Sequence, residues 1–589
     1  MAKSDPSLDR RTFLTLSGVS LGLLASGCKP KSEPSTGLEE VTPELERLPT
    51  VEAPQKNGHE IEELLDIHYT DTEWEQLLTG YDDQIDLLRK VRALNHPNSL
   101  APAQVFDPRL PGVKYNTGND VFRLSATPTP LPTNQEDIAF APATHLAHWI
   151  QSKQITSLEL TELYLNRIQL FNSRLQCFIT ITEDLARKQA QQADEEIKKG
   201  HYRGPLHGLP FGLKDLFDTQ GISTTWGAAP YKNNIPDSDA HIVKKLRDAG
   251  AVLLGKTSCG AIAYGDIWYG GVTRNPWDTR EGSSGSSAGS ASATAAGLVA
   301  FSIGTETLGS IVSPSVRCGV TGLRPTFGRV GRTGGMALCW SLDKIGAICR
   351  SVEDTAVVLK AINGFDSGDA SSISTEFDYA ADADLSKLRV GYDPQFFSHE
   401  EAHALNREVF ASLKSTGVQL TEIKLPARNA EPLMLQLLVE AAAAFEDLTL
   451  SNKDDELRWQ ENEAWPNGFR QTRLIPAVEY IQADRLRRLF MEDMEQLFQD
   501  VDVIIGDNFG GGMLRITNFT GHPQLTLPCG FMNRTIRAAF EETNVVEGET
   551  GDFPASIGMW GSLFGESKLL AVGRALEKTL NVNSRRPSF

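Results

Sequence analysis

The sequence has few residues of the kinds that build metal sites or disulfide frameworks. Seven cysteines are scattered through 589 residues without a C-x-x-C pair, and the eleven histidines include no H-E-x-x-H motif. These spacings exclude the common metal-binding patterns, and a chain of this length forms a core without disulfides. We therefore expect no metal and no cofactor, and the six cysteines that follow Cys28 are expected to be free and buried.

Positive charge is also in deficit. The chain has 57 Lys and Arg against 76 Asp and Glu, which gives a net charge of −19. Because nucleic-acid-binding proteins present a basic face, this balance argues against a nucleic-acid partner, although it leaves room for a local basic patch. Hydrophobic residues make up 40% and charged residues 23%, and these ordinary globular values exclude global disorder and collagen-like repeats.

The apolar run near the N-terminus is too short for a permanent membrane-spanning helix, which needs about 20 apolar residues. Within residues 1–28, Arg10 and Arg11 precede this run, and small residues from Ala25 onward precede Cys28. This order is typical of an export signal. The arginine pair resembles the twin-arginine signal, and the last four residues resemble a lipoprotein processing box. We expect an exported protein, either periplasmic or membrane-anchored through a lipid on Cys28. A buried N-terminal helix is the alternative.

The rest of the chain divides into a tether, a small extension and one large body. Residues 29–58 are rich in Pro, Glu, Lys and Ser and are predicted to form a flexible tether. Residues 59–136 are predicted to form a helical extension, because apolar residues recur at threes and fours over 70–94 with an interruption near Gly80. These helices either pack on the body or mediate association, for example into a homodimer. Residues 137–589 form the body.

The body alternates between helical and extended apolar segments. Two helices are expected over 143–175, the second beginning at Ser157, and further helices over 183–199, 241–249, 351–363, 400–416, 431–450 and 476–500. Strands are expected over 177–182, 251–254, 388–391 and 501–505. This alternation indicates an α/β layered core.

Glycine and serine are concentrated in one part of the body. Residues 282–335 hold 12 Gly and 10 Ser in 54 positions. A Gly/Ser tract is usually a linker, but this one runs directly into residues 293–304, which read as a small-residue helix followed by a buried strand. Gly309 before Ser310 allows a tight turn that points backbone amides at one spot. That arrangement could form an oxyanion site beside a hydroxyl nucleophile.

A serine nucleophile needs a base, and no histidine lies near these serines in the sequence. Lys214 ends the segment HGLPFGLK, and a lysine is costly to bury among apolar groups. Burial would lower its pKa and allow it to act as a base through a second serine. The alternative is an exposed lysine that pairs with Asp215.

Three ordered motifs resemble the amidase signature family. They are GLPFGLKD, GSSAGSASATAAGLVAFSIGTETLGS and CGVTGLRPT, and the resemblance extends over roughly residues 139–580. It includes NPWD at 275–278 and NFTGHPQLTLPCG at 518–530. The resemblance implies a layered α/β fold with a central mixed sheet flanked by helices. It also implies hydrolysis of amides by a Ser-cisSer-Lys triad.

The family's spacing assigns the triad. Its bridging serine lies 24 positions before the nucleophile, so Ser310 as nucleophile pairs with Ser286 and not with Ser283. Ser286 would follow a cis peptide bond, and Lys214 would be the base. The backbone amides of Thr307, Leu308, Gly309 and Ser310 would form the oxyanion hole.

The sequence departs from the family pattern at three positions beside the nucleophile. Leu308 replaces a glycine, Glu306 replaces an aspartate, and Val312 replaces an arginine. The first two changes affect local geometry, and the third removes the arginine that could bind an anionic substrate. The expected activity is hydrolysis of a small-molecule amide to a carboxylate and ammonia or an amine, through an acyl-enzyme on Ser310.

Three other functions compete with this one. An α/β-hydrolase would use Ser287 in a G-x-S-x-G turn, but that turn needs a hydrophobic strand before it and the preceding segment is loop-like. A glutaminase subunit of an amidotransferase would work in the cytoplasm, against the export signal. A non-catalytic binding protein with the same fold would not need the Lys-Ser-Ser set. The substrate is not specified, and Trp459 and Trp465, within 431–475, mark either a pocket rim or ordinary surface helices.

Overall fold

The computed structural model describes residues 62, 65–79, 81–115, 118–126, 130–397, 404–537, 548–582 and 585–588. Residues 62–589 cluster into one compact unit. The expected export signal, the tether and Cys28 lie outside the described residues. Within the described part, no helix combines the length and the apolar character that crossing a bilayer requires.

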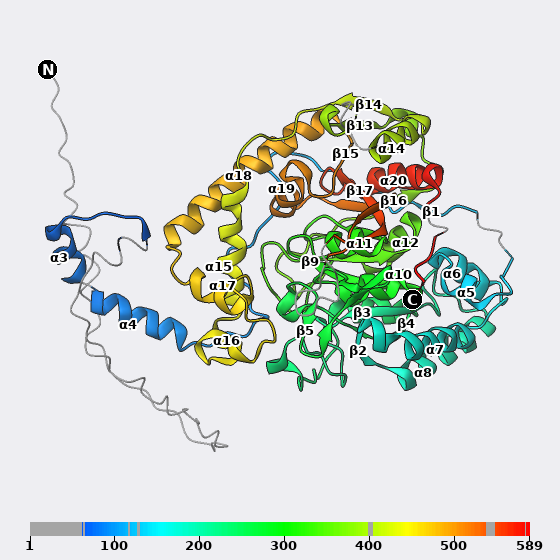
Figure 1. Cartoon of the computed structure of the whole chain (residues 1–589), viewed down its shortest axis with the longest axis horizontal. Coiled ribbons are helices and arrows are strands. Elements are labelled where there is room, and N and C mark those ends of the chain that lie inside the picture. Colours follow the sequence, from blue (N-terminus) through cyan, green and yellow to red (C-terminus); the bar gives the residue numbers. More distant parts are fainter. Residues whose placement is uncertain are drawn as a thin grey trace, which may run out of the picture. The chain divides into compact units, whose positions relative to one another are not determined.

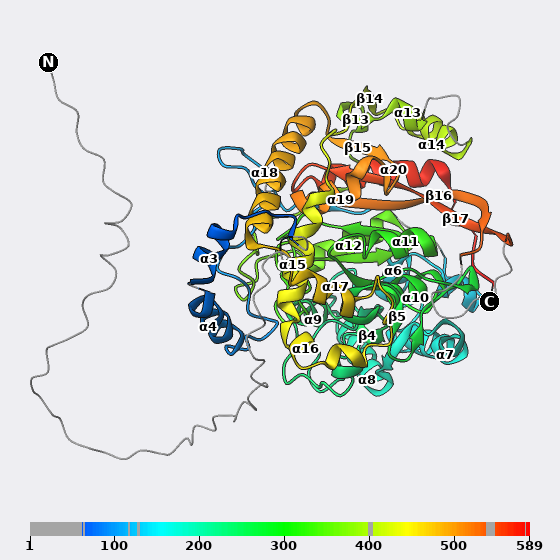
Figure 2. The same cartoon turned by 60° about the vertical axis from the view of Figure 1, so that its left-hand side comes forward.

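The predicted N-terminal extension is helical in its first part only. Helices α3 (Asp71–Thr79) and α4 (Tyr81–Arg92) lie on either side of position 80, where the sequence predicts a break (Figures 1 and 2). Beyond α4 the described residues make contacts with the body. Asn98 exchanges two hydrogen bonds of 2.8 Å with the backbone of Ala337. Strand β1 (Phe122–Arg123) pairs in parallel with β12 (Tyr379–Ala380).

A mixed sheet of eleven strands forms the centre of the body, in the order β14-β13-β15-β17-β16-β10-β11-β9-β3-β4-β2. The strands are β2 (Phe178–Ile181), β3 (Pro210–Lys214), β4 (Val252–Thr257), β9 (Phe301–Glu306), β10 (Thr321–Arg324), β11 (Lys344–Cys349), β13 (Arg389–Tyr392), β14 (Gln419–Glu422), β15 (Val503–Gly506), β16 (Gln524–Thr535) and β17 (Thr550–Gly561). The trios β14-β13-β15 and β9-β3-β4 are parallel, and the other pairs are antiparallel. The predicted fold class is confirmed.

Helices cover this sheet. They include α5 (Gln135–Ala139), α6 (Ala143–Gln151), α7 (Ser157–Leu175), α8 (Glu183–Lys198), α9 (His241–Asp248), α10 (Ala288–Ala295), α11 (Val312–Cys318), α12 (Val352–Ile362), α14 (Ala404–Ser415) and α20 (Glu566–Leu580). Helix α8 contacts β4, α10 contacts β3 and β9, α12 contacts β11, and α20 contacts β16 and β17. Apart from α11, whose Cys318 belongs to a small separate cluster, these helices and the strands share one large buried cluster.

A second apolar cluster lies beside the sheet and includes residues of α15 (Met434–Ala444), α17 (Trp465–Thr472), α18 (Ala477–Asp500) and α19 (Met513–Thr520). Figure 2 shows α15, α17 and α18 side by side, in yellow and orange. Leu216, two residues after β3, belongs to the same cluster. The second cluster therefore reaches the carboxyl end of a central strand.

Most of the predicted elements are confirmed. The second helix of 143–175 begins at Ser157, because Thr156 caps it through a capping box with Glu159. The single helix expected over 431–450 is wrong, since Phe445 leaves helical geometry (φ −122°, ψ 29°) between α15 and α16 (Glu446–Leu450). The six cysteines after Cys28 are free and buried, as expected.

Candidate functional site

Two parallel strands at the centre of the sheet bring the site together. Strands β3 and β9 are neighbours, with Leu213 opposite Ile303, so their carboxyl ends meet at one edge of the sheet. Ligands in α/β sheets bind at the carboxyl ends of parallel strands. Lys214 is the last residue of β3, and Glu306 is the last residue of β9.

Lys214 is fully buried and faces hydroxyl groups. Its Nζ donates hydrogen bonds to Ser286 Oγ at 2.9 Å, to Ser287 Oγ at 3.1 Å and to Thr305 Oγ1 at 2.7 Å. Burial lowers the pKa of Lys214 to about 7. The amine therefore exchanges protons near neutral pH while it stays bonded to a serine hydroxyl.

Asp215 does not pair with Lys214, so the alternative of an exposed Lys214–Asp215 pair is wrong. Asp215 instead forms a fully buried ion pair with Lys256 of β4, with Oδ1 and Nζ 3.1 Å apart. Lys256 also donates to the carbonyl oxygen of Phe217 at 2.8 Å. Lys256 is therefore the ion-pair partner of Asp215, and no carboxylate among the described residues lies within ion-pair distance of Lys214.

The serine loop lies between β8 (Asp278–Gly282) and α10. The Gly285–Ser286 peptide bond is cis, at the position that the resemblance implies. A Cβ on Gly285 would lie 1.8 Å from the carbonyl oxygen of Gly265, so this position accepts only glycine. Strand β8 is polar (DTREG) and belongs to a separate two-stranded sheet with β7 (Arg274–Asn275). The hydrophobic strand that a G-x-S-x-G turn at Ser287 needs is therefore missing from this position.

Ser287 ties the serine loop to the end of β9. Its Oγ donates to the carbonyl oxygen of Thr305 at 3.0 Å and accepts from the Thr305 amide at 3.2 Å. Its own amide donates to the carbonyl oxygen of Ser310 at 3.1 Å. Ser287 is thus a structural link, and it holds Ser310 close to Ser286 and Lys214.

Ser310 lies in a tight turn between β9 and α11. Gly309 adopts a φ of +86°, which favours glycine. The four amides of residues 307–310 donate no hydrogen bond to any described residue, and neither does the Ser310 hydroxyl. Successive free amides in such a turn form an anion-binding concavity beside that hydroxyl.

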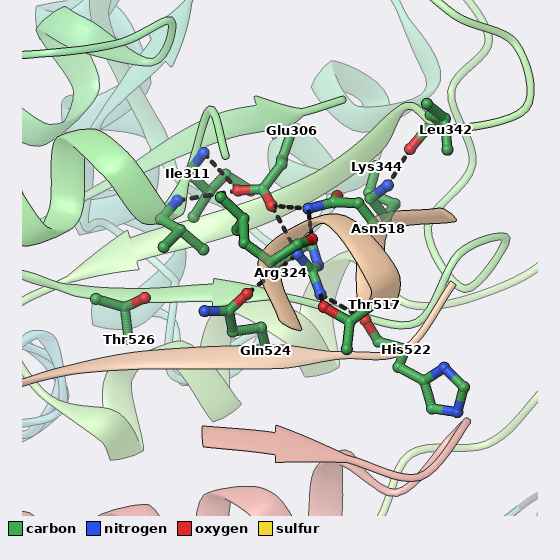
Figure 3. Close-up of polar contacts among 12 residues, drawn as sticks. Glu306, Ile311, Arg324, Leu342, Lys344, Thr517, Asn518, His522, Gln524 and Thr526 are labelled. Atoms are coloured by element: carbon green, nitrogen blue, oxygen red, sulfur yellow. Dashed lines mark hydrogen bonds and ion pairs between the residues drawn. The ribbon is translucent and has the colours of Figure 1, made fainter. Parts of the chain in front are cut away.

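A buried network around Glu306 fixes this turn (Figure 3). Glu306 Oε2 accepts from the amides of Ile311 and Val312 at 2.8 and 3.0 Å. Glu306 Oε1 accepts from Arg324 at 2.7 Å and from Asn518 Nδ2 at 2.8 Å. Arg324 and these hydrogen bonds outweigh the effect of burial and lower the pKa of Glu306 to about 2. The carboxylate therefore stays ionised and anchors the residues directly after Ser310.

A pocket opens at Ser310. Its lining residues are Tyr264, Gly265, Asp266, Gly282, Ser284, Gly285, Leu308, Gly309, Ser310, Ser313, Arg317, Trp459, Phe509, Leu514 and Arg537. Trp459, one of the two tryptophans considered from the sequence, lies on this pocket. Trp465 is buried instead, and its Nε1 donates to the carbonyl oxygen of Ile262 at 2.9 Å.

Sequence reasoning missed several residues of the site. Thr305 contacts Lys214, Asp266 and Arg317 line the pocket, and Arg324 and Asn518 hold Glu306. The last two occur in quoted motifs, GLRPT and NFTG, but without a role. Asp266 and Arg317 stand in no recognised motif. Among the described residues no cluster of His, Cys, Asp and Glu could hold a metal ion.

Comparisons with known proteins agree with this geometry. A family model described as Amidase matches residues 159–570. A glutamyl-tRNA(Gln) amidotransferase subunit of Carboxydothermus hydrogenoformans is 30% identical, over 77% of this chain and 100% of that protein. The corresponding protein of Hahella chejuensis is 32% identical, over 75% and 97%. The structure of native peptide amidase from Stenotrophomonas maltophilia superposes with a TM-score of 0.65 and 29% identity, over 76% and 98%.

Proposed function

Because the chain belongs to the Amidase family, we propose that it hydrolyses the carboxamide C–N bond of a small molecule through an acyl-enzyme on Ser310. One observation carries this proposal. Buried Lys214 is hydrogen-bonded to Ser286, and the next residue, Ser287, donates through its amide to the carbonyl oxygen of Ser310, which ends a turn whose amides donate no hydrogen bond to any described residue. The products are a carboxylate and ammonia or an amine.

The proposed reaction uses a proton relay. Neutral Lys214 takes a proton from Ser286 as Ser286 takes one from Ser310, and the Ser310 oxygen attacks the amide carbonyl carbon. The amides of residues 307–310 stabilise the resulting oxyanion. As the tetrahedral intermediate collapses, the relay returns the proton to the leaving nitrogen. Water then attacks the acyl-enzyme by the same relay and releases the carboxylate.

Ammonia release from a panel of primary amides tests this proposal. Ser310→Ala should abolish release, because the nucleophile is lost, and Lys214→Ala and Ser286→Ala should each remove most of it. Ser283→Ala is the matched control. Ser283 lies in the same loop, but the family spacing does not assign it to the triad, so this variant should retain activity. Full activity in both Lys214→Ala and Ser286→Ala would overturn the relay.

A second candidate function is a glutaminase that serves an amidotransferase. The two relatives that are glutamyl-tRNA(Gln) amidotransferase subunits, at 30% and 32% identity, favour it. Glutamine hydrolysis that requires an added partner protein would support this candidate, whereas hydrolysis of simple amides by the chain alone supports the amidase. If the chain is instead a non-catalytic binding protein, it would bind amides but release no ammonia from any of them.

We also propose that the protein is exported and that Cys28 carries a lipid. This rests on Arg10, Arg11 and the apolar residues before Cys28. Replacing both arginines with lysine should leave the protein in the cytoplasm. Cys28→Ala should release it from the membrane fraction while export continues. An unchanged membrane fraction in Cys28→Ala would refute the anchor.

A further inference from the structure

Two charged side chains in the Ser310 pocket have hydrogen-bonding capacity that the protein does not use. Asp266 follows the Gly265 carbonyl that contacts the serine loop, and Arg317 lies on α11, the helix directly after Ser310. Both line the same pocket as the proposed nucleophile. Charged groups with unused hydrogen-bonding capacity at a substrate pocket point to the chemistry of the substrate.

Asp266 is held rigidly by one oxygen and leaves the other free. Its Oδ2 accepts from the amide of Ser284 at 2.9 Å, and a Cβ on Gly282 would lie only 2.1 Å from that oxygen. Its Oδ1 has no hydrogen-bond partner among the described residues, although the side chain is only 4% exposed. Burial raises the pKa of Asp266 to about 6, so the group is ionised at neutral pH. A buried carboxylate oxygen without a donor is costly, and a substrate that supplies one removes this cost.

Arg317, the second charged residue of the pocket, has hydrogen-bond donors that the protein does not use. Its guanidinium donates no hydrogen bond to any described residue, and its ion-pair partner, Glu281, lies 3.8 Å away. Glu281 is already engaged, because Arg534 donates to both of its oxygens at 2.6 and 3.0 Å. The amide of Arg537 donates to it as well, at 2.7 Å. Arg317 therefore keeps its five donors available for a planar acceptor such as a carboxylate.

The charges at this end of the pocket favour a ligand that carries an anionic group beside a cationic group. Four arginines, Arg274, Arg317, Arg534 and Arg537, lie near two carboxylates, those of Glu281 and Asp266. The excess positive charge favours a carboxylate near Arg317, whereas the free oxygen of Asp266 favours a nitrogen donor. A purely fatty or aromatic acyl group would leave both groups unpaired, and such sites discriminate strongly against analogues that lack the polar groups.

We propose that this part of the pocket binds a zwitterionic group on the acyl side of the amide substrate, with its ammonium donating to Asp266 and its carboxylate accepting from Arg317. This inference rests on the proposed amidase function, since it places the charged groups relative to Ser310. It also accounts for Val312, where the resemblance loses an arginine, because Arg317 on the same helix supplies a guanidinium to the pocket.

Four matched primary amides test the inference. Glutamine carries both charged groups, γ-aminobutyramide only the ammonium, glutaramate only the carboxylate, and butyramide neither. We expect kcat/KM for ammonia release to fall about tenfold to a hundredfold for each group removed, as expected for hydrogen bonds between charged partners. A wild-type enzyme that hydrolyses butyramide as well as glutamine overturns the inference and leaves the amidase function intact.

Two variants assign the groups. In Asp266→Asn, the ratio of kcat/KM for glutamine to that for glutaramate should fall toward one. In Arg317→Gln, the ratio for glutamine to γ-aminobutyramide should fall in the same way. Arg280→Gln is the matched control and should keep all ratios, because Arg280 pairs with Asp278 and Glu549 and does not line the pocket. If either pocket variant slows all four substrates equally, its ratio is unchanged, the residue only supports the loop, and the inference fails.

Binding separates this inference from the reaction. Calorimetric titration of Ser310→Ala should show glutamine binding about tenfold or more tightly than glutaramate or γ-aminobutyramide. Such a preference in a protein whose wild type releases no ammonia would refute the amidase function and uphold the zwitterion site. Equal affinities for the three amides would refute the site.

Discussion

Replacing Glu306 by glutamine should both destabilise and inactivate the protein, and the structure gives the size of the effect. The carboxylate is fully buried and accepts four hydrogen bonds, two through each oxygen. A glutamine offers one oxygen and one NH₂ group in place of the two carboxylate oxygens. In either orientation its NH₂ group faces two donors, either the amides of Ile311 and Val312 or the side chains of Arg324 and Asn518. The Arg324 guanidinium, also fully buried, loses its only carboxylate within ion-pair distance among the described residues.

Breaking a buried ion pair costs about 3–5 kcal/mol. Arg324 keeps three other acceptors, Thr517 Oγ1 at 2.8 Å, the His522 carbonyl at 2.8 Å and Gln524 Oε1 at 3.2 Å. Because these acceptors still stabilise the guanidinium, we expect the cost of losing the ion pair to be near the lower end of that range. One unsatisfied backbone amide adds about 1–3 kcal/mol. We therefore expect Glu306→Gln to lower the free energy of unfolding by about 4–6 kcal/mol. Since the same carboxylate holds the turn at Ser310, kcat should fall at least about a hundredfold.

Urea titration followed by tryptophan fluorescence measures the first effect, and ammonia release below the unfolding transition measures the second. Glu306→Gln combined with Arg324→Met removes both buried charges and should recover most of the stability but not the activity. The exposed substitution Glu479→Gln on α18 is the control and should change stability by less than about 0.5 kcal/mol. A Glu306→Gln protein with wild-type stability and kcat would refute the role of this network.

Three further predictions concern the same edge of the sheet. Because burial lowers the pKa of Lys214 to about 7, its amine is protonated below this pH, so kcat/KM should rise through about pH 7 and then level off; a profile flat between pH 5 and 9 would contradict Lys214 as the base. Lys256→Met leaves the buried carboxylate of Asp215 unpaired and should cost about 3–5 kcal/mol by urea titration, and adding Asp215→Asn should restore part of it. Gly285→Ala should abolish activity and lower the thermal midpoint because its Cβ would lie 1.8 Å from a carbonyl oxygen, whereas Gly468→Ala, whose nearest neighbour lies at 3.7 Å, should do neither.

The sequence predicts the fold class and the positions of the three proposed triad residues because these depend on local patterns. Apolar periodicity marks α7, and an ordered series of motifs marks Lys214, Ser286 and Ser310. The partners of Glu306 could not be assigned in this way. Arg324 lies 18 positions away and Asn518 212 positions away, and only the folded sheet brings them to one carboxylate.

The charged pocket was hidden for a related reason. Asp266 lies between a glycine and two large apolar residues, and nothing in its neighbours marks it as a pocket residue. Its importance comes from an oxygen left without a donor, which is a property of packing and not of composition. The break at Phe445 was likewise invisible, because the flanking residues are good helix formers and tertiary packing decides the interruption.

The long-range bonds to Glu306 mean that the turn at Ser310 is held by segments that lie far apart in the sequence. Asn518 is synthesised 212 residues after Glu306 and Gln524 200 residues after Arg324, yet each pair is hydrogen-bonded beside the turn at Ser310. A nascent chain that ends before residue 518 already contains the complete Lys-Ser-Ser set but lacks the parts that hold its turn in place. Hydrolytic activity should therefore emerge only when the C-terminal strands have joined the sheet, so its recovery during refolding reports the completion of the whole body.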